Sequence, residues 1–248
     1  MNKNVINVIS VILSSFMLAP VFLIIINAFI RGVDSWTLLV DDLKKILPMA
    51  FRGILCATLS ALFQTSFSVL GGYTLVLKAR NMKILFPILV FGMLIPFQVS
   101  FLPIYILMKN IGLYGSILSV VIVESLNPMG ILFFSLYLKQ IPAVYYEIVR
   151  LNSNRNIDVL RYIIFPYCVK ASLFYFVIYF CKVWSTSEIS DRLIGVSGDN
   201  TLVSYISTTY QSSPYTFQLC LITLIPILFS GIVLWLIFKI SKKYSLNI

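Results

Sequence analysis

Charged side chains are scarce in this sequence, and that scarcity limits the folds that the chain can adopt. Only 11% of the 248 residues are charged, 59% are hydrophobic, and histidine is absent. Soluble domains carry about 25% charged residues, so this composition indicates an integral membrane protein. The apolar segments leave no room for a soluble domain beyond loops, and we predict a single membrane domain over residues 1–248.

Six segments are long and apolar enough for membrane-spanning helices, each of which needs about 20 such residues. They predict an all-α polytopic fold with six transmembrane helices. The paired glycines at Gly71 and Gly72 predict a close approach to a neighbouring helix. The segments lie near Val5–Ile30, Gly53–Leu77, Ile84–Met108, Ser116–Leu138, Val169–Val183 and Phe217–Ile240.

The basic residues concentrate in alternate loops, which fixes an expected orientation. Lysine and arginine dominate the loops after the second and fourth segments and the C-terminal tail, whereas the other loops are balanced or acidic. Basic loops stay on the cytoplasmic side, so we expect both termini and region 141–166 to be cytoplasmic. The net charge of +10 is then a sign of topology and not of nucleic-acid binding. On the outer side, Arg31–Arg52 predicts an amphipathic stretch lying on the leaflet, with a plain loop as the alternative.

Region 141–166 is the only long polar interruption in the middle of the chain. It predicts two short helices joined by a polar turn, because Asn and Ser side chains satisfy nearby backbone groups. We expect Asn156 to cap the second helix and Pro166 to end it. Apolar residues at helical spacing give the first helix one apolar face: Val144, Ile148 and Leu151.

The spacing in this region resembles the cytoplasmic "EAA" loop of ABC-importer permeases. That family's pattern is Glu-Ala-Ala, three residues, Gly, nine residues, Ile, any residue and Leu-Pro. Glu147, Ile163 and Pro166 match it in register. The departures are Ile148 and Val149 for the alanines, Asn152 where Asp is common, Ser153 for the glycine and Phe165 for the leucine.

Residues 91–114 resemble the third span of the smaller permease subunit of maltose-type sugar importers. Two prolines seven residues apart should also bend this span; a bend of this kind lines a cavity or is only a packing kink. The matching residues are Pro96, Gln98, Pro103, Ile104, Tyr105, Lys109, Gly112 and Leu113.

The fourth segment carries Glu124 and Asn127, three residues apart and so expected on one helical face. A carboxylate inside the membrane is costly and faces protein or water. Lys182 could neutralise Glu124 only if the two lay at one depth, and the sequence places Glu124 nearer mid-membrane. Residues that either line the substrate pathway or serve packing are Gln98, Tyr105, Glu124 and Asn127.

The resemblance implies a permease subunit of an ATP-driven importer for a sugar or oligosaccharide in the bacterial cell membrane. The sequence has no phosphate-binding G-x-x-x-x-G-K-[ST] motif, so we predict no enzymatic activity, and ATP and Mg would bind partner subunits. The cysteines lack metal-ligand spacing, and we expect no metal and no cofactor in this chain.

The implied partners are a second permease subunit forming a heterodimer, two ATPase subunits, an extracytoplasmic solute-binding protein and membrane lipid. Two other functions stay open: an ion- or proton-coupled secondary transporter, and a non-transporting membrane scaffold. Residues expected to couple the permease to the ATPases are Glu147, Ile148, Val149, Arg150, Leu151, Asn152, Ser153, Ile163 and Pro166.

Overall fold

The structure, a computed structural model, describes most of the central part of the chain. In this part all regular structure is helical, and three helices are long and apolar enough to cross a membrane, or four if one bent pair forms a single span. The predicted first and sixth spans lie outside it except for single positions. The described residues are 22–23, 26, 36–77, 79–152, 155–186, 188–194, 201–209, 231–232, 235 and 239.

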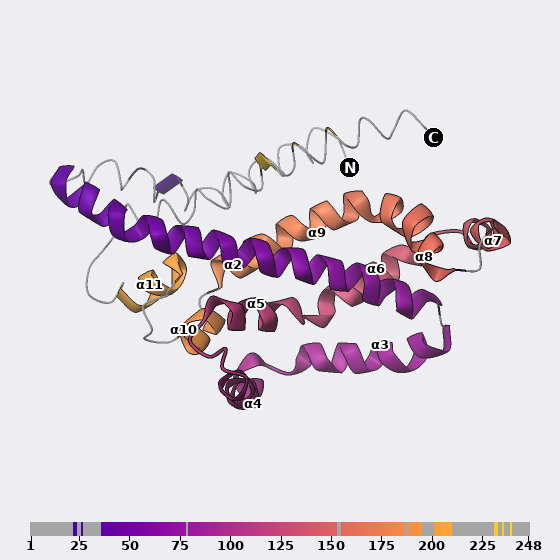
Figure 1. Ribbon diagram of the computed structural model, residues 1–248, viewed down its shortest axis with the longest axis horizontal. Helices are drawn as coiled ribbons and strands as arrows, with labels where there is room; N and C mark the ends of the chain where they lie inside the picture. The colour runs from indigo at the N-terminus through magenta and orange to yellow at the C-terminus, as the bar shows by residue number, and fades with distance from the viewer. Residues whose placement is uncertain are drawn as a thin grey trace, which may run out of the picture.

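The longest helix, α2 (Trp36–Leu77), runs along the whole bundle (Figure 1). Its 42 residues make it about 63 Å long at 1.5 Å per residue. The predicted start at Gly53 and the separate surface stretch over Arg31–Arg52 are therefore wrong, because from Trp36 onward the chain is one helix that continues through Pro48. Charges at the start of this helix lower its hydropathy, but they do not interrupt the backbone hydrogen bonds of a helix.

Glycines bring α2 close to α6 (Pro128–Leu138), as the sequence predicted. A Cβ on Gly72 would lie 2.8 Å from the Cβ of Phe134 and 2.8 Å from the backbone nitrogen of Ser135. On the α6 side, a Cβ on Gly130 would lie 1.9 Å from the Ser68 hydroxyl oxygen. Only glycine allows the two backbones to pack at this distance.

The predicted third span is two helices, α3 (Ala79–Leu94) and α4 (Phe97–Asn110), with a bend of 96° between them. Pro96 has extended geometry as the residue that precedes α4, and a proline also disfavours helical geometry in the residue before it, which is Ile95. Pro103 lies inside α4, so only the first of the two prolines bends the chain. Gly112 follows α4 with a φ of 73°, a left-handed geometry that favours glycine.

The predicted fourth span is confirmed as one candidate span, Ile117–Leu138, although a short interruption divides it into α5 (Ile117–Ser125) and α6. Asn127 caps α6, and its side-chain oxygen accepts a hydrogen bond of 2.9 Å from the Met129 backbone nitrogen. Pro128 occupies the first turn of α6, where its missing N–H group is not needed. Because the break lies between them, Glu124 and Asn127 do not share a helical face.

The region that matched the family loop forms α7 (Ala143–Asn152) and α8 (Asn156–Val159). A π-helical turn (Leu160–Ile164) then leads directly into α9 (Phe165–Ser185). Two expectations are wrong here: Arg155 is the cap of α8 in place of Asn156, and Pro166 does not end a helix. The helix continues from the π-helical turn through Pro166, so Asn156–Ser185 forms one apolar run of 30 residues. The predicted fifth span was too short.

Two buried clusters hold the described helices together. The larger one joins α2, α6 and α9 and includes Phe134, Tyr175 and Phe180. The smaller one lies at the end of the bundle opposite α7, where α4, α5 and α10 (Glu188–Ile194) meet Cys56 of α2. A further short helix, α11 (Leu202–Thr209), also packs on α2.

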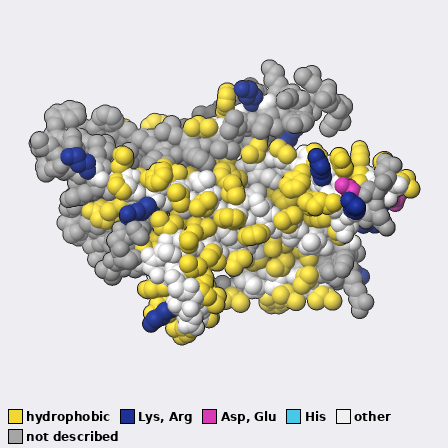
Figure 2. All heavy atoms as spheres, viewed as in Figure 1, with side chains coloured by type: hydrophobic (Ala, Val, Ile, Leu, Met, Phe, Trp, Pro, Cys, Tyr) yellow, Lys and Arg dark blue, Asp and Glu magenta, His cyan; other side chains and the backbone are white. Residues whose placement is uncertain are grey.

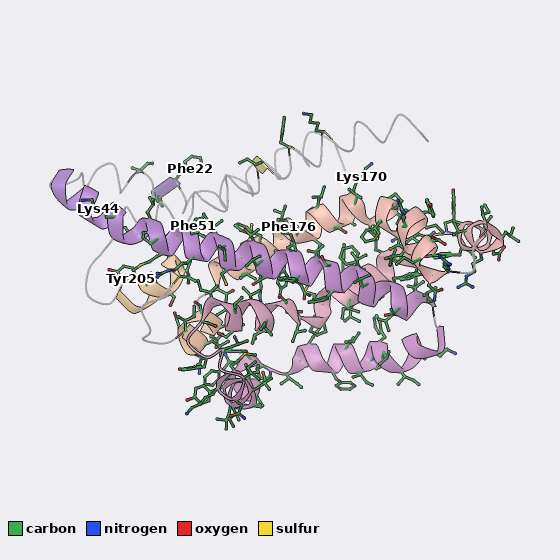
Figure 3. The ribbon with its side chains drawn as sticks, in the orientation of Figure 1. Phe22, Lys44, Phe51, Lys170, Phe176 and Tyr205 are labelled. Carbon is green, nitrogen blue, oxygen red and sulfur yellow. The ribbon has the colours of Figure 1, made fainter. Side chains whose placement is uncertain are left out.

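The surface agrees with a membrane environment. Figure 2 shows hydrophobic side chains over the middle of one face and lysine and arginine toward its edges. Figure 3 places Lys44 near the start of α2 and Lys170 toward the opposite end, on α9. Apolar side chains over the middle are covered at no cost by lipid, whereas charged groups are stable near the water-facing ends.

Candidate functional site

The helix α7 lies at the extreme end of the molecule, beyond α6 and α8 (Figure 1). Ile141 just before it is 7% exposed, and Val159 and Ile164 after it are almost fully buried in the larger cluster. The phenol of Tyr73, near the end of α2, donates a hydrogen bond of 3.2 Å to the backbone oxygen of Asn156. Both ends of the segment that carries α7 are thus anchored to the transmembrane bundle.

The outward face of α7 is apolar and uncovered in this chain. Leu151 is 85% exposed, and its neighbours on this face, Val144, Tyr145 and Ile148, are all more than half exposed. Glu147 and Arg150 are exposed beside them. An exposed apolar patch rimmed by charged residues is typical of a surface that contacts another protein or the membrane.

The other side of α7 turns toward the bundle. Tyr146 and Val149 are partly buried against the larger cluster, and burial raises the pKa of the Tyr146 phenol above its usual value. Of the residues expected to couple to an ATPase, Val149 and Ile163 therefore pack inward. Pro166 is exposed in the first turn of α9, and Ser153 lies outside the described residues.

Glu124 forms a buried polar cluster with two residues of α9. Its side chain is 3% exposed, and its Oε2 atom contacts the Nζ atom of Lys182. The Tyr179 hydroxyl donates to the Glu124 carboxylate at 3.1 Å and to its backbone oxygen at 2.6 Å. The sequence argument that depth separates Glu124 from Lys182 is wrong, because the fourth span breaks one residue after Glu124 and α5 is only nine residues long. A buried carboxylate needs such partners to remain charged.

The break in the fourth span is also held from α2. Gln64, which is 1% exposed, donates from Nε2 to the backbone oxygen of Asn127 at 2.5 Å. The same atom lies 3.4 Å from the Tyr175 hydroxyl. Gln64 was not predicted as a site residue, although an amide in the middle of an apolar helix is costly unless it has a partner.

The remaining predicted pathway residues lie elsewhere. Gln98, in α4, donates to a carboxylate oxygen of Glu188 in α10 at 2.6 Å. Tyr105 packs edge-on against Tyr114, with ring centroids 4.9 Å apart. The contacts in the described part therefore give Gln98 and Tyr105 other partners than Glu124 and Asn127, whose side chains both interact with the Tyr179 hydroxyl.

A small cavity with both polar and apolar lining residues lies beside Glu124. Its volume of about 10 Å³ corresponds to about one water molecule. Elements far apart in the sequence meet around it, since α2, α5, α9, α10 and α11 all contribute. Lining residues include Gly53, Cys56, Glu124, Trp184, Ser190 and Thr201. Among the described residues, no group of three or more acidic or cysteine side chains is placed to hold a metal ion.

The fold is similar to that of a known transporter structure. A chain described as "Inward facing conformations of the MetNI methionine ABC transporter: CY5 native crystal form" superposes with a TM-score of 0.64. The alignment covers 82% of this chain and 97% of that chain, at 12% sequence identity. No protein-family model matches the sequence, and no curated protein matches it. At this identity the likeness shows the fold alone.

Proposed function

We propose that this chain is a permease subunit of an ATP-driven ABC importer and forms part of its translocation pathway. The uncovered apolar face of α7 carries the proposal, because it lies at the end of the bundle where an ATPase subunit would dock. The likeness of the fold to a chain of an ABC transporter supports the same function.

In this function α7 is the coupling helix. Leu151 and Ile148 would enter an apolar groove of the ATPase, with Glu147 meeting a cationic side chain at its rim. Anchoring through Ile141 and Ile164 would make the segment move as a rigid body, so closure of the ATPases would tilt the spans on either side of it. ATP and Mg bind the partner subunits and not this chain.

The complete importer would contain a second permease subunit, two ATPase subunits and an extracytoplasmic binding protein in the bacterial cell membrane. We retain a sugar or oligosaccharide as the solute, because residues 91–114 resemble that part of maltose-type permeases. Aromatic and amide groups such as Tyr105 and Gln98 suit a neutral polyhydroxylated solute. Uptake of labelled maltodextrin and of labelled methionine tests the solute class, and uptake of methionine alone would contradict the sugar assignment.

An ion-coupled carrier is less well supported. Such a carrier needs an acid in the membrane that can release and bind its ion. Glu124 is the only acidic residue within the predicted spans, and Lys182 already neutralises it. A scaffold role is also less well supported, because the fold is similar to that of a chain of an ABC transporter.

Co-purification of an ATPase with the tagged chain from native membranes tests the proposal. Glu147→Lys and Leu151→Asp should each lower ATPase recovery strongly, since truncating one partner of a desolvated charge pair or a central anchor costs about 2–5 kcal/mol. The matched control is Lys139→Glu, which reverses an exposed charge at the same end of the bundle but off α7. Equal recovery of the ATPase with all three variants would refute the docking role of α7.

A further inference from the structure

The smaller buried cluster gathers three helices at one end of the bundle, where α5 also packs on α2. At the end opposite α7, α4, α5 and α10 are held together by their own contacts; we call them the distal cluster. The Gly115 backbone nitrogen donates to the Leu193 backbone oxygen at 2.9 Å, and Gln98 donates to Glu188. The guanidinium of Arg192 lies 5.3 Å from the centre of the Phe101 ring. These contacts join α10 to α4 and to the chain just before α5.

Breaks in the helices separate the distal cluster from the rest of the bundle. Between α3 and α4 the chain bends by 96° at Pro96. Between α5 and α6 the helix is interrupted at Leu126 and Asn127, and α9 ends at Ser185 before α10 begins. Interruptions of this kind concentrate backbone rotation in a few residues, so the helices on either side can move as units.

A polar contact joins α5 of the distal cluster to α9. Lys182 and Tyr179 belong to α9, which packs in the larger cluster, and both contact Glu124 at the end of α5. The small cavity next to Glu124 lies at the same junction, between α2, α5, α9, α10 and α11. Lys182 is 40% exposed at its side chain, so solvent can reach one partner of the ion pair when the other remains buried.

We propose that Lys182 and Tyr179 form a latch on Glu124 that holds the distal cluster against α2 and α9 and keeps this end of the permease closed. Release of the latch lets α5 turn about the break at Asn127 and opens the cavity beside Cys56. The inference rests on the proposed function, because a permease pathway must open at the end opposite the ATPases once in each cycle. Lys182 and Tyr179 are then positioning residues and are not solute ligands.

Cys56 provides a native reporter for this opening. Its side chain is 2% exposed and lines the cavity. Cys168 is 1% exposed but belongs to the larger cluster, near the other end of α9. Labelling of the full chain in native membranes with N-ethylmaleimide, read at each cysteine by peptide mass spectrometry, therefore distinguishes local opening from general unfolding.

We expect Cys56 in the Lys182→Met variant to react with N-ethylmaleimide at least about tenfold faster than Cys56 in the unmodified chain. A tenfold change corresponds to about 1.4 kcal/mol in the free energy of opening. Labelling of Cys168 should stay unchanged. The variant Lys182→Arg retains the charge and should protect Cys56 almost as well as lysine does. The double variant Glu124→Gln with Lys182→Met leaves no unpaired buried charge, and it should still label rapidly at Cys56.

Two results would overturn the latch. If the double variant protects Cys56 as well as the unmodified chain does, the ion pair only compensates buried charge. If labelling of Cys168 rises in parallel with that of Cys56 in both variants, the whole fold has loosened. The assay needs no ATPase, so its outcome is separate from the co-purification that tests the proposed function.

Discussion

The contact between α2 and α6 at Gly72 is so close that the loss of stability on adding a side chain there can be predicted. A Cβ at this position would lie 2.8 to 2.9 Å from Phe134 and Ser135, including backbone atoms, so Gly72→Ala must push the two helices apart by about half an ångström. Overpacking of this kind costs about 1–3 kcal/mol. Alanine also recovers up to about 1 kcal/mol because it forms helices better than glycine does. We therefore expect a net loss of stability.

Gly92→Ala is the matched control, because nothing lies within 4 Å of a Cβ at that position. Both substitutions share the gain in helix propensity, so the difference in stability between the two variants reports the clash alone, about 1–3 kcal/mol. Gly71→Ala should be intermediate, since its Cβ would meet only the Ile131 side chain, at 3.0 to 3.2 Å, and that side chain can rotate.

Thermal unfolding of the purified chain in detergent measures these differences. For a chain of this size each 1 kcal/mol shifts the midpoint by about 2–4 °C, and all variants are scanned at one rate because irreversible unfolding makes the midpoint depend on it. Gly72→Ala should melt lowest and Gly92→Ala at or above the unmodified chain. If Gly72→Ala melts with Gly92→Ala, the close packing of α2 on α6 is refuted.

Two further predictions concern topology and the turn after α7. A reporter fused after Lys83 or Asn154 should be cytoplasmic and one after Asp199 extracytoplasmic, because basic loops stay inside; an extracytoplasmic Asn154 would refute the coupling role of α7. At the end of α7, Asn152→Val should change ATPase recovery little, because Asn152 is the last helical residue of α7 and no described residue other than glycine has a positive φ. Ser153→Gly should be neutral or slightly stabilising, because the loop pattern that this region resembles has glycine at that position. A strong loss of ATPase recovery with either variant would contradict these expectations.

The sequence alone determined where helices of the bundle lie and where two of their special features occur. Apolar runs predicted the spans around Gly53–Leu77 and Ser116–Leu138, and a proline predicted the bend at Pro96. Paired glycines predicted the close approach of α2 to another helix. These features are local, because hydrophobicity and backbone geometry depend on neighbouring residues. They can therefore be predicted from the order of the residues alone.

Tertiary structure decided which polar groups meet. The sequence placed Glu124 and Lys182 at different depths, but packing of α5 against α9 brings the two side chains into contact. It gave no reason to pair Gln64 with the backbone of Asn127, or Gln98 with Glu188. Such contacts depend on how far neighbouring helices shift and rotate against one another. The packing of all their side chains sets this shift and rotation, whereas the residue pattern along one helix indicates only which of its faces is buried.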